Sequence, residues 1–181
     1  GYASAMLEIA DQAKAQGFTP AAVVHCSGSA GTQAGLVVAA SLCSPETKVV
    51  GIDIDAEPER VHADVVSIGK AAAHLLGVPF EGERAEVIAG HAGPAYGLAH
   101  KATWEAIVLA GRLEALVLDP VYTGKALAGM IALIEKGVWT RQDNLVFLHT
   151  GGTPGIFAYA SQFQCDSPLQ GMVPTIIGEK D

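Results

Sequence analysis

The sequence of 181 residues carries 11 lysines and arginines against 19 aspartates and glutamates, a formal net charge of −8, and half of it is hydrophobic. A chain of this length and hydrophobicity can bury a core as one domain, which excludes disorder as its main state. The acidic balance without a basic run argues against a nucleic-acid partner. No run of 18 apolar residues is present, so we expect no membrane-spanning helix.

The cysteines and histidines indicate the redox environment of the protein and whether a metal site is expected. The three cysteines, Cys26, Cys43 and Cys165, are odd in number and widely spaced. They make a poor disulfide framework, so we expect a reducing, cytoplasmic location. With no CxxC or HExxH spacing we expect no metal site. The chain starts at Gly1 in a helical pattern, without a starting methionine or a signal peptide. We therefore expect a processed product, a fragment or an incomplete chain.

Apolar runs of strand length alternate with helical patterns along the chain. Because these runs are continuous rather than alternating, they indicate a mainly parallel sheet with helices on both faces, a three-layer α/β fold. We expect one domain over 1–163 and a loosely structured tail over 164–181. Strands are predicted at 21–26, 48–55, 85–89 and 145–149, and helices at 1–17, 33–42, 58–76, 98–110 and 123–135, with a last helix ending at 161.

Ligands of such sheets bind outside the carboxyl ends of the strands, where the loops 27–32, 119–125 and 150–155 should lie. The first loop, SGSAGT, joins a strand to a helix and has only small side chains. Its backbone amides could hold a phosphate group. It matches neither the Walker A motif nor GxGxxG nor GxSxG. A plain strand-to-helix turn with a Ser/Thr cap is the alternative.

The second loop offers Tyr122 as a proton donor or a stacking ring, and Thr123 as a helix cap or a ligand contact. We expect Lys125 to be a solvated helix lysine rather than a Schiff-base lysine. Asp119 suits a structural turn.

The third loop places Thr150 at a strand tip, beside a glycine pair that lets backbone approach a ligand. The Thr150 hydroxyl could equally bond nearby backbone. We expect His149 to be a satisfied, partly buried histidine. Tyr96, between two loop glycines, is either an ordinary tyrosine or one placed above a cofactor.

Four segments together resemble a known enzyme family, and they follow the family's order along nearly the whole chain. They are SGSAGTQAGL at 27–36, AYGL at 95–98, LDPVYTGKALAGMI at 118–131 and FLHTGGTPGIFAY at 147–159. The resemblance is to the fold-type II, tryptophan synthase beta-like pyridoxal-phosphate enzymes. Within them it is to the branch of D-cysteine desulfhydrase, L-cysteate sulfo-lyase and 1-aminocyclopropane-1-carboxylate deaminase.

The resemblance implies that pyridoxal 5′-phosphate is the cofactor, that the substrate is an amino acid and that the protein is a homodimer. It places Tyr96 and Tyr122 near the substrate or the ring face, as catalytic candidates. It places Thr150 near the pyridine nitrogen, with Thr123 and Gly151 as further cofactor contacts. The cofactor phosphate is implied to lie on Ser29, Ala30, Gly31 and Thr32.

Two departures from the family pattern guide the expected reaction. The resemblance implies a glutamate at position 123 in the deaminases, whereas this chain has Thr123. A neutral partner gives a weaker electron sink, so we expect β-elimination from D-cysteine or L-cysteate, with the deaminase as an alternative. The family's Schiff-base lysine lies in an Asn-Lys motif that is absent here, because Asn144 is the sole asparagine. We expect the chain alone to be inactive. A non-catalytic domain that binds a phosphorylated small molecule also remains open.

Overall fold

The computed structural model describes residues 1–82 and 84–165, and the order of elements alternates strands with helices. Strands are β1 (Ala22–Ser27), β2 (Lys48–Asp53), β3 (Glu86–Ile88) and β4 (Leu145–Phe147). Helices are α1 (Tyr2–Ala15), α2 (Gly31–Cys43), α3 (Pro58–Leu76), α4 (Lys101–Glu114), α5 (Thr123–Glu135), a 3₁₀ helix η1 (Thr153–Tyr159) and α6 (Ala160–Cys165).

The four strands form one sheet in the order β3-β2-β1-β4, and every neighbouring pair is parallel. Strand β1 pairs with β2 over its whole length, from Ala22 opposite Lys48 to Ser27 opposite Asp53. All four strands therefore end at the same edge, as the sequence predicted. The loops that follow β1 and β2 meet at this edge.

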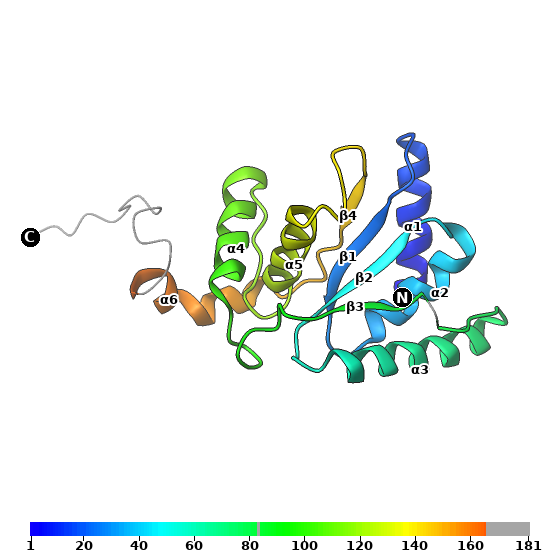
Figure 1. Ribbon diagram of the computed structural model, residues 1–181, viewed down its shortest axis with the longest axis horizontal. Coiled ribbons are helices and arrows are strands. Elements are labelled where there is room, and N and C mark those ends of the chain that lie inside the picture. The colour runs from blue at the N-terminus through cyan, green and yellow to red at the C-terminus, as the bar shows by residue number, and fades with distance from the viewer. Residues whose placement is uncertain (83, 166–181) are drawn as a thin grey trace, which may run out of the picture.

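Helices cover both faces of the sheet, so the predicted three-layer α/β fold is confirmed (Figure 1). On one face Met6, Leu36 and Val61 of α1, α2 and α3 pack against Val23 and Val49 of the strands. On the other face Ala126 of α5 packs on Val24 and Ile52. Helix α4 packs on α5 around Trp104 and Ile107. Burial of the alternating strand side chains on both faces explains why the strand sequences are continuously apolar.

Most predicted elements agree with the structure, and the last helix differs. It extends to Cys165 and its first part, Thr153–Tyr159, is a 3₁₀ helix. Gly152 has a φ of 87°, and Pro154 follows in the first turn. A left-handed residue and a proline in the first turn fix the start of this segment. The predicted domain boundary at 163/164 falls within α6, and residues 166–181 lie outside the described residues.

Within the described ranges no helix is long and apolar enough to cross a membrane.

Candidate functional site

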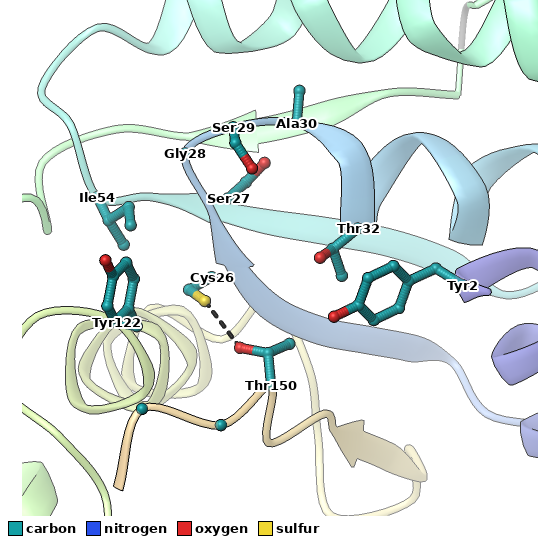
Figure 2. A pocket seen from close by; sticks show the side chains of 12 residues that line it. Tyr2, Cys26, Ser27, Gly28, Ser29, Ala30, Thr32, Ile54, Tyr122 and Thr150 are labelled. Atoms are coloured by element: carbon teal, nitrogen blue, oxygen red, sulfur yellow. Dashed lines mark hydrogen bonds between the residues drawn. The ribbon is translucent and has the colours of Figure 1, made fainter. Parts of the chain in front are cut away.

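A cavity of about 220 Å³ opens at the carboxyl edge of the sheet. Figure 2 shows it between the loop after β1 and the loop that carries Thr150, with Tyr2 on one side and Tyr122 on the other. Two of the three predicted loops and the tyrosine of the third thus share one cavity. It is lined by Tyr2, Cys26, Ser27, Gly28, Ser29, Ala30, Thr32, Ile54, Tyr122, Thr150, Gly151 and Gly152.

The loop after β1 has the geometry of an anion cradle. Ala30 adopts a left-handed conformation with a φ of 65° and turns the chain into α2. The Gly31 amide donates to the Ser29 carbonyl at 2.8 Å, whereas the amides of Thr32 and Gln33 have no carbonyl within the helix to bond, and the helix dipole favours a negative charge there. A Cβ at Gly28 would lie 3.0 Å from two side-chain carbons of Ile54, so glycine lets this loop pack closely.

The hydroxyl of Ser27 supports a ligand at this loop. Ser27 is buried, lines the cavity, and its Oγ has no hydrogen-bond partner among the described residues. Buried hydroxyls are normally satisfied, so an unpartnered one at a cavity wall fits an oxygen-bearing ligand or water. The small residues, the helix start and this hydroxyl together fit a phosphate group.

The opposite end of the cavity carries a thiol and a hydroxyl. Cys26 Sγ and Thr150 Oγ1 lie 3.0 Å apart (Figure 2). Burial raises the pKa of the Cys26 thiol, so it is protonated and uncharged at neutral pH. The Thr150 hydroxyl bonds this side chain rather than nearby backbone. The pair is electrically neutral.

Tyr122 is linked to Tyr96 by a hydrogen bond between the two phenols. Their ring centroids are 6.2 Å apart and the planes are tilted by 71°. The hydrogen bond, with burial and nearby negative charge, raises the pKa of Tyr122 to about 12. Tyr122 lines the cavity, whereas Tyr96 is 62% exposed and reaches it only through Tyr122. Tyr159 donates a hydrogen bond of 2.8 Å to the carbonyl of Gly97 and holds the loop of Tyr96 in place.

Thr123 is buried and does not line the cavity. Its hydroxyl donates to Asp119 Oδ1 at 2.8 Å and accepts from the Asp119 amide at 3.1 Å. The Asp119 carboxylate also accepts from the amides of Val121, Tyr122 and Thr123, so it caps the start of α5. Asp119 takes the role of a structural turn residue, which the sequence allowed. Thr123 acts here as its partner, and its predicted contact with a cofactor has no support in this geometry.

Lys125 corrects a prediction. We expected a solvated lysine, but its side chain is fully buried. Nζ donates to the carbonyl of Ile54 at 3.4 Å. Burial lowers the pKa of Lys125, and the negative charges of Asp55, Asp119 and Asp53 oppose this shift. The segment at the end of β2, where Ile54 lies, packs over this position.

His149 is satisfied and partly buried, as expected. Its Nε2 donates to the carbonyl of Val117 at 3.2 Å, and Nδ1 accepts from the Gly151 amide at 3.2 Å. Gly151 lines the cavity, as do three of the four residues predicted to hold the phosphate. Gly31 lies between Ala30 and Thr32, and a Cβ there would meet nothing within 4 Å.

Sequence reasoning missed three lining residues: Tyr2, Cys26 and Ile54. The strand position of Cys26, one residue before the predicted loop, was the available signal. Tyr2 lies 33 positions from Gly35, where a Cβ would meet the Tyr2 Cβ at 2.9 Å. That close approach of α1 to α2 has no signal in the local pattern.

Among residues 1–82 and 84–165 there is no group of three or more His, Cys, Asp or Glu able to hold a metal ion.

Comparison with known proteins assigns this chain to a family. Residues 1–151 match the model of a family described as pyridoxal-phosphate dependent enzymes. The chain is 37% identical over 166 residues to 1-aminocyclopropane-1-carboxylate deaminase of Burkholderia ambifaria, covering 91% of this chain and 49% of the relative. It is 38% identical over 162 residues to D-cysteine desulfhydrase of Yersinia enterocolitica, covering 90% and 49%. The chain spans about half the length of these curated relatives.

Solved structures agree. The crystal structure of a homologue of 1-aminocyclopropane-1-carboxylate deaminase superimposes with a TM-score of 0.80 at 34% identity. It covers 89% of this chain and 47% of the other. The crystal structure of a threonine deaminase from T.th. superimposes with a TM-score of 0.52 at 23% identity over 81% of this chain and 55% of the other, a likeness of fold alone.

Proposed function

We propose that this chain, which belongs to the family of pyridoxal-phosphate dependent enzymes, holds the cofactor in a lyase that eliminates sulfide from D-cysteine. The overall reaction takes D-cysteine and water to pyruvate, ammonia and hydrogen sulfide, and it balances without an oxidant or reductant. When bound, the cofactor supplies an electron sink for bond breaking at the substrate's Cα. The chain's own residues bind and orient it.

The cavity supports a definite placement of the cofactor. We place its phosphate on Ser29, Ala30, Gly31 and Thr32, with the unpartnered Ser27 hydroxyl as a further donor. Thr150 and Gly151, at the other end of the cavity, would hold the ring. A volume of about 220 Å³ lies below the ~300–1,000 Å³ of sites for drug-sized ligands, as suits one small ring with a phosphate.

The neutral pair of Cys26 and Thr150 is the observation that carries the choice of reaction. Its S–H and O–H groups offer no negative charge to a ring nitrogen, so they do not favour protonation of that nitrogen. The electron sink is then weak. Loss of a good sulfur leaving group requires less of the sink than the opening of a carbon ring. We therefore favour D-cysteine over 1-aminocyclopropane-1-carboxylate.

The protonated phenol of Tyr122 also supports an elimination reaction. Its hydrogen bond to Tyr96 keeps the phenol protonated well above neutral pH, so it holds a proton rather than accepting one. A protonated phenol at the cavity wall can orient the substrate or donate to the departing sulfur. Tyr96 then acts through Tyr122 as a positioning residue.

The test is a product assay on the full-length protein supplied with pyridoxal phosphate. We expect pyruvate and sulfide from D-cysteine, and little of the four-carbon 2-oxo acid that 1-aminocyclopropane-1-carboxylate would yield. Release of sulfite from L-cysteate is measured as a third reaction in the same assay. Dominant turnover of the cyclopropane substrate would replace the proposal by the deaminase, since the chain is about equally similar to a deaminase (37%) and to a D-cysteine desulfhydrase (38%). Cofactor binding without turnover of any substrate would favour the non-catalytic domain.

The assembly and location of the protein are proposals as well. An apolar groove of about 500 Å³ runs between α4 and α5, with Leu109, Leu113 and Ile131 in its walls. This face supports a homodimer, which sedimentation velocity would test. The free thiols of Cys26 and Cys43 are consistent with a reducing cytoplasm.

A further inference from the structure

Lys125 occupies an unusual position for a lysine. The side chain is fully buried, and Nζ is 3.4 Å from the carbonyl oxygen of Ile54. Burying an ammonium group is costly unless nearby groups compensate its charge. A buried lysine in the first turn of α5 therefore needs a reason in its surroundings.

Three carboxylates supply that compensation. Asp53 and Asp55 flank Ile54 at the end of β2, and Asp119 precedes α5. All three act on Lys125 through their negative charge. Asp55 also forms an ion pair of 3.0 Å with Arg60, but Arg60 is shared with Glu57 and Asp64 at the surface. Lys125 is thus the buried positive charge among these carboxylates.

The segment that Lys125 holds supports the anion cradle. Ile54 lines the cavity, and Gly28 of the loop packs on it. A Cβ at Gly28 would also lie 3.3 Å from Asp55 Oδ2, so a carboxylate stands directly behind the loop. A phosphate brings further negative charge to this place. Without the ammonium group, the negative charges of the aspartates would repel a phosphate bound at this loop.

We propose that Lys125 is a positioning residue whose buried ammonium group is the counter-charge of the phosphate loop. It holds the Ile54 carbonyl and offsets Asp53, Asp55 and Asp119, which allows the loop 27–32 to accept the cofactor phosphate. The inference rests on the proposed assignment of the phosphate to this loop. It predicts that Lys125 acts on the phosphate and has little effect on the ring.

The experiment measures binding of pyridoxine 5′-phosphate, which has no aldehyde and so reports the non-covalent site, by calorimetry on the 181-residue chain. Pyridoxine without phosphate is the reference ligand. Lys125→Met should weaken binding of the phosphate ester roughly tenfold and change pyridoxine binding less than twofold. Adding Asp55→Asn to Lys125→Met should recover at least threefold. Lys101→Met removes an exposed charge paired with Glu105 and is the matched control, with no change expected.

Unchanged affinity of folded Lys125→Met for the phosphate ester would overturn the inference, and so would equal losses for both ligands or a failure of Asp55→Asn to restore binding. If Lys125→Met does not fold, Asp55→Asn alone decides. It should tighten binding of the phosphate ester, and unchanged or weaker binding contradicts the inference. A wild-type chain that binds both ligands equally would instead refute the phosphate site of the proposed function, and the inference with it.

Discussion

The thiol of Cys26 and the hydroxyl of Thr150 lie 3.0 Å apart although 124 positions separate them in the chain. Parallel pairing of β1 with β4 brings the two together, because Cys26 is the next-to-last residue of β1 and Thr150 lies just beyond the end of β4, at the same edge. Burial raises the pKa of the thiol, so its S–H is available as a donor to Thr150. The hydroxyl hydrogen of Thr150 is then free to point into the cavity.

Thr150→Val should lower turnover of D-cysteine by the full-length protein by about tenfold, since it removes the hydrogen bond that we propose to the cofactor, worth roughly 1–1.5 kcal/mol. Thr150→Ser keeps the hydroxyl and should stay within a few-fold of the wild type. Steady-state kinetics with circular dichroism for folding is the measurement. Wild-type turnover in Thr150→Val would make Thr150 a turn residue only.

Tyr96→Phe should lower the pKa of Tyr122 from about 12 toward the ordinary value near 10. The folded-state pKa lies above that of the unfolded chain, so this hydrogen bond stabilises the fold below pH ~10. Its contribution is lost as the pH rises through 10 to about 12. Ultraviolet absorbance of the phenolate, compared with Tyr122→Phe, follows the titration. A Tyr122 phenol that ionises at the same pH with and without Tyr96 argues against the pair.

Burial of His25 predicts an acid-sensitive fold. The imidazole is fully buried, and burial lowers its pKa from 6.5 to about 4. Because the folded-state pKa is depressed, the neutral form stabilises the fold above pH 6.5, and this contribution falls as the pH drops toward 4. Urea unfolding at pH 7 and pH 5 should show roughly 2 kcal/mol more loss in the wild type than in His25→Asn. An NMR titration that places this imidazole near its ordinary pKa would contradict the prediction.

Substitution of Gly31 tests the phosphate loop without disturbing the fold. Since a Cβ at this position meets nothing within 4 Å, Gly31→Leu should unfold at the same temperature as the wild type. Its side chain would compete with the phosphate and should weaken binding of pyridoxal phosphate at least tenfold, about 1.4 kcal/mol. Gly111→Leu is a matched control on the exposed side of α4, where the added Cβ has a single neighbour at 3.8 Å. Unchanged affinity in Gly31→Leu would remove this loop from the site.

Local patterns in the sequence predicted the elements and the edge where the site lies. Pro58 at the start of α3 and Gly77 with a φ of 66° after its end show why those bounds could be read directly. Continuous apolar strands indicated a parallel sheet, which brings the loops after β1 and β4 to one edge.

Such local patterns could not predict the contacts between distant segments. Burial of Lys125 depends on Ile54, 71 positions away, whose strand packs over the start of α5. Unless that packing is known, a lysine in a predicted helix is expected to be solvated. Likewise, the turn of Thr123 toward Asp119 depends on a capping geometry that its neighbours do not specify.

Amide chemical shifts of the ¹⁵N-labelled chain, titrated with pyridoxine 5′-phosphate and with pyridoxine, test the cofactor cavity most directly. We predict that the phosphate ester perturbs the amides of 28–33 most strongly, with smaller changes at 150–152. Pyridoxine alone should leave the amides of 28–33 nearly unchanged. Phosphate-dependent shifts centred elsewhere, for example in the groove between α4 and α5, with 28–33 unmoved, would contradict it.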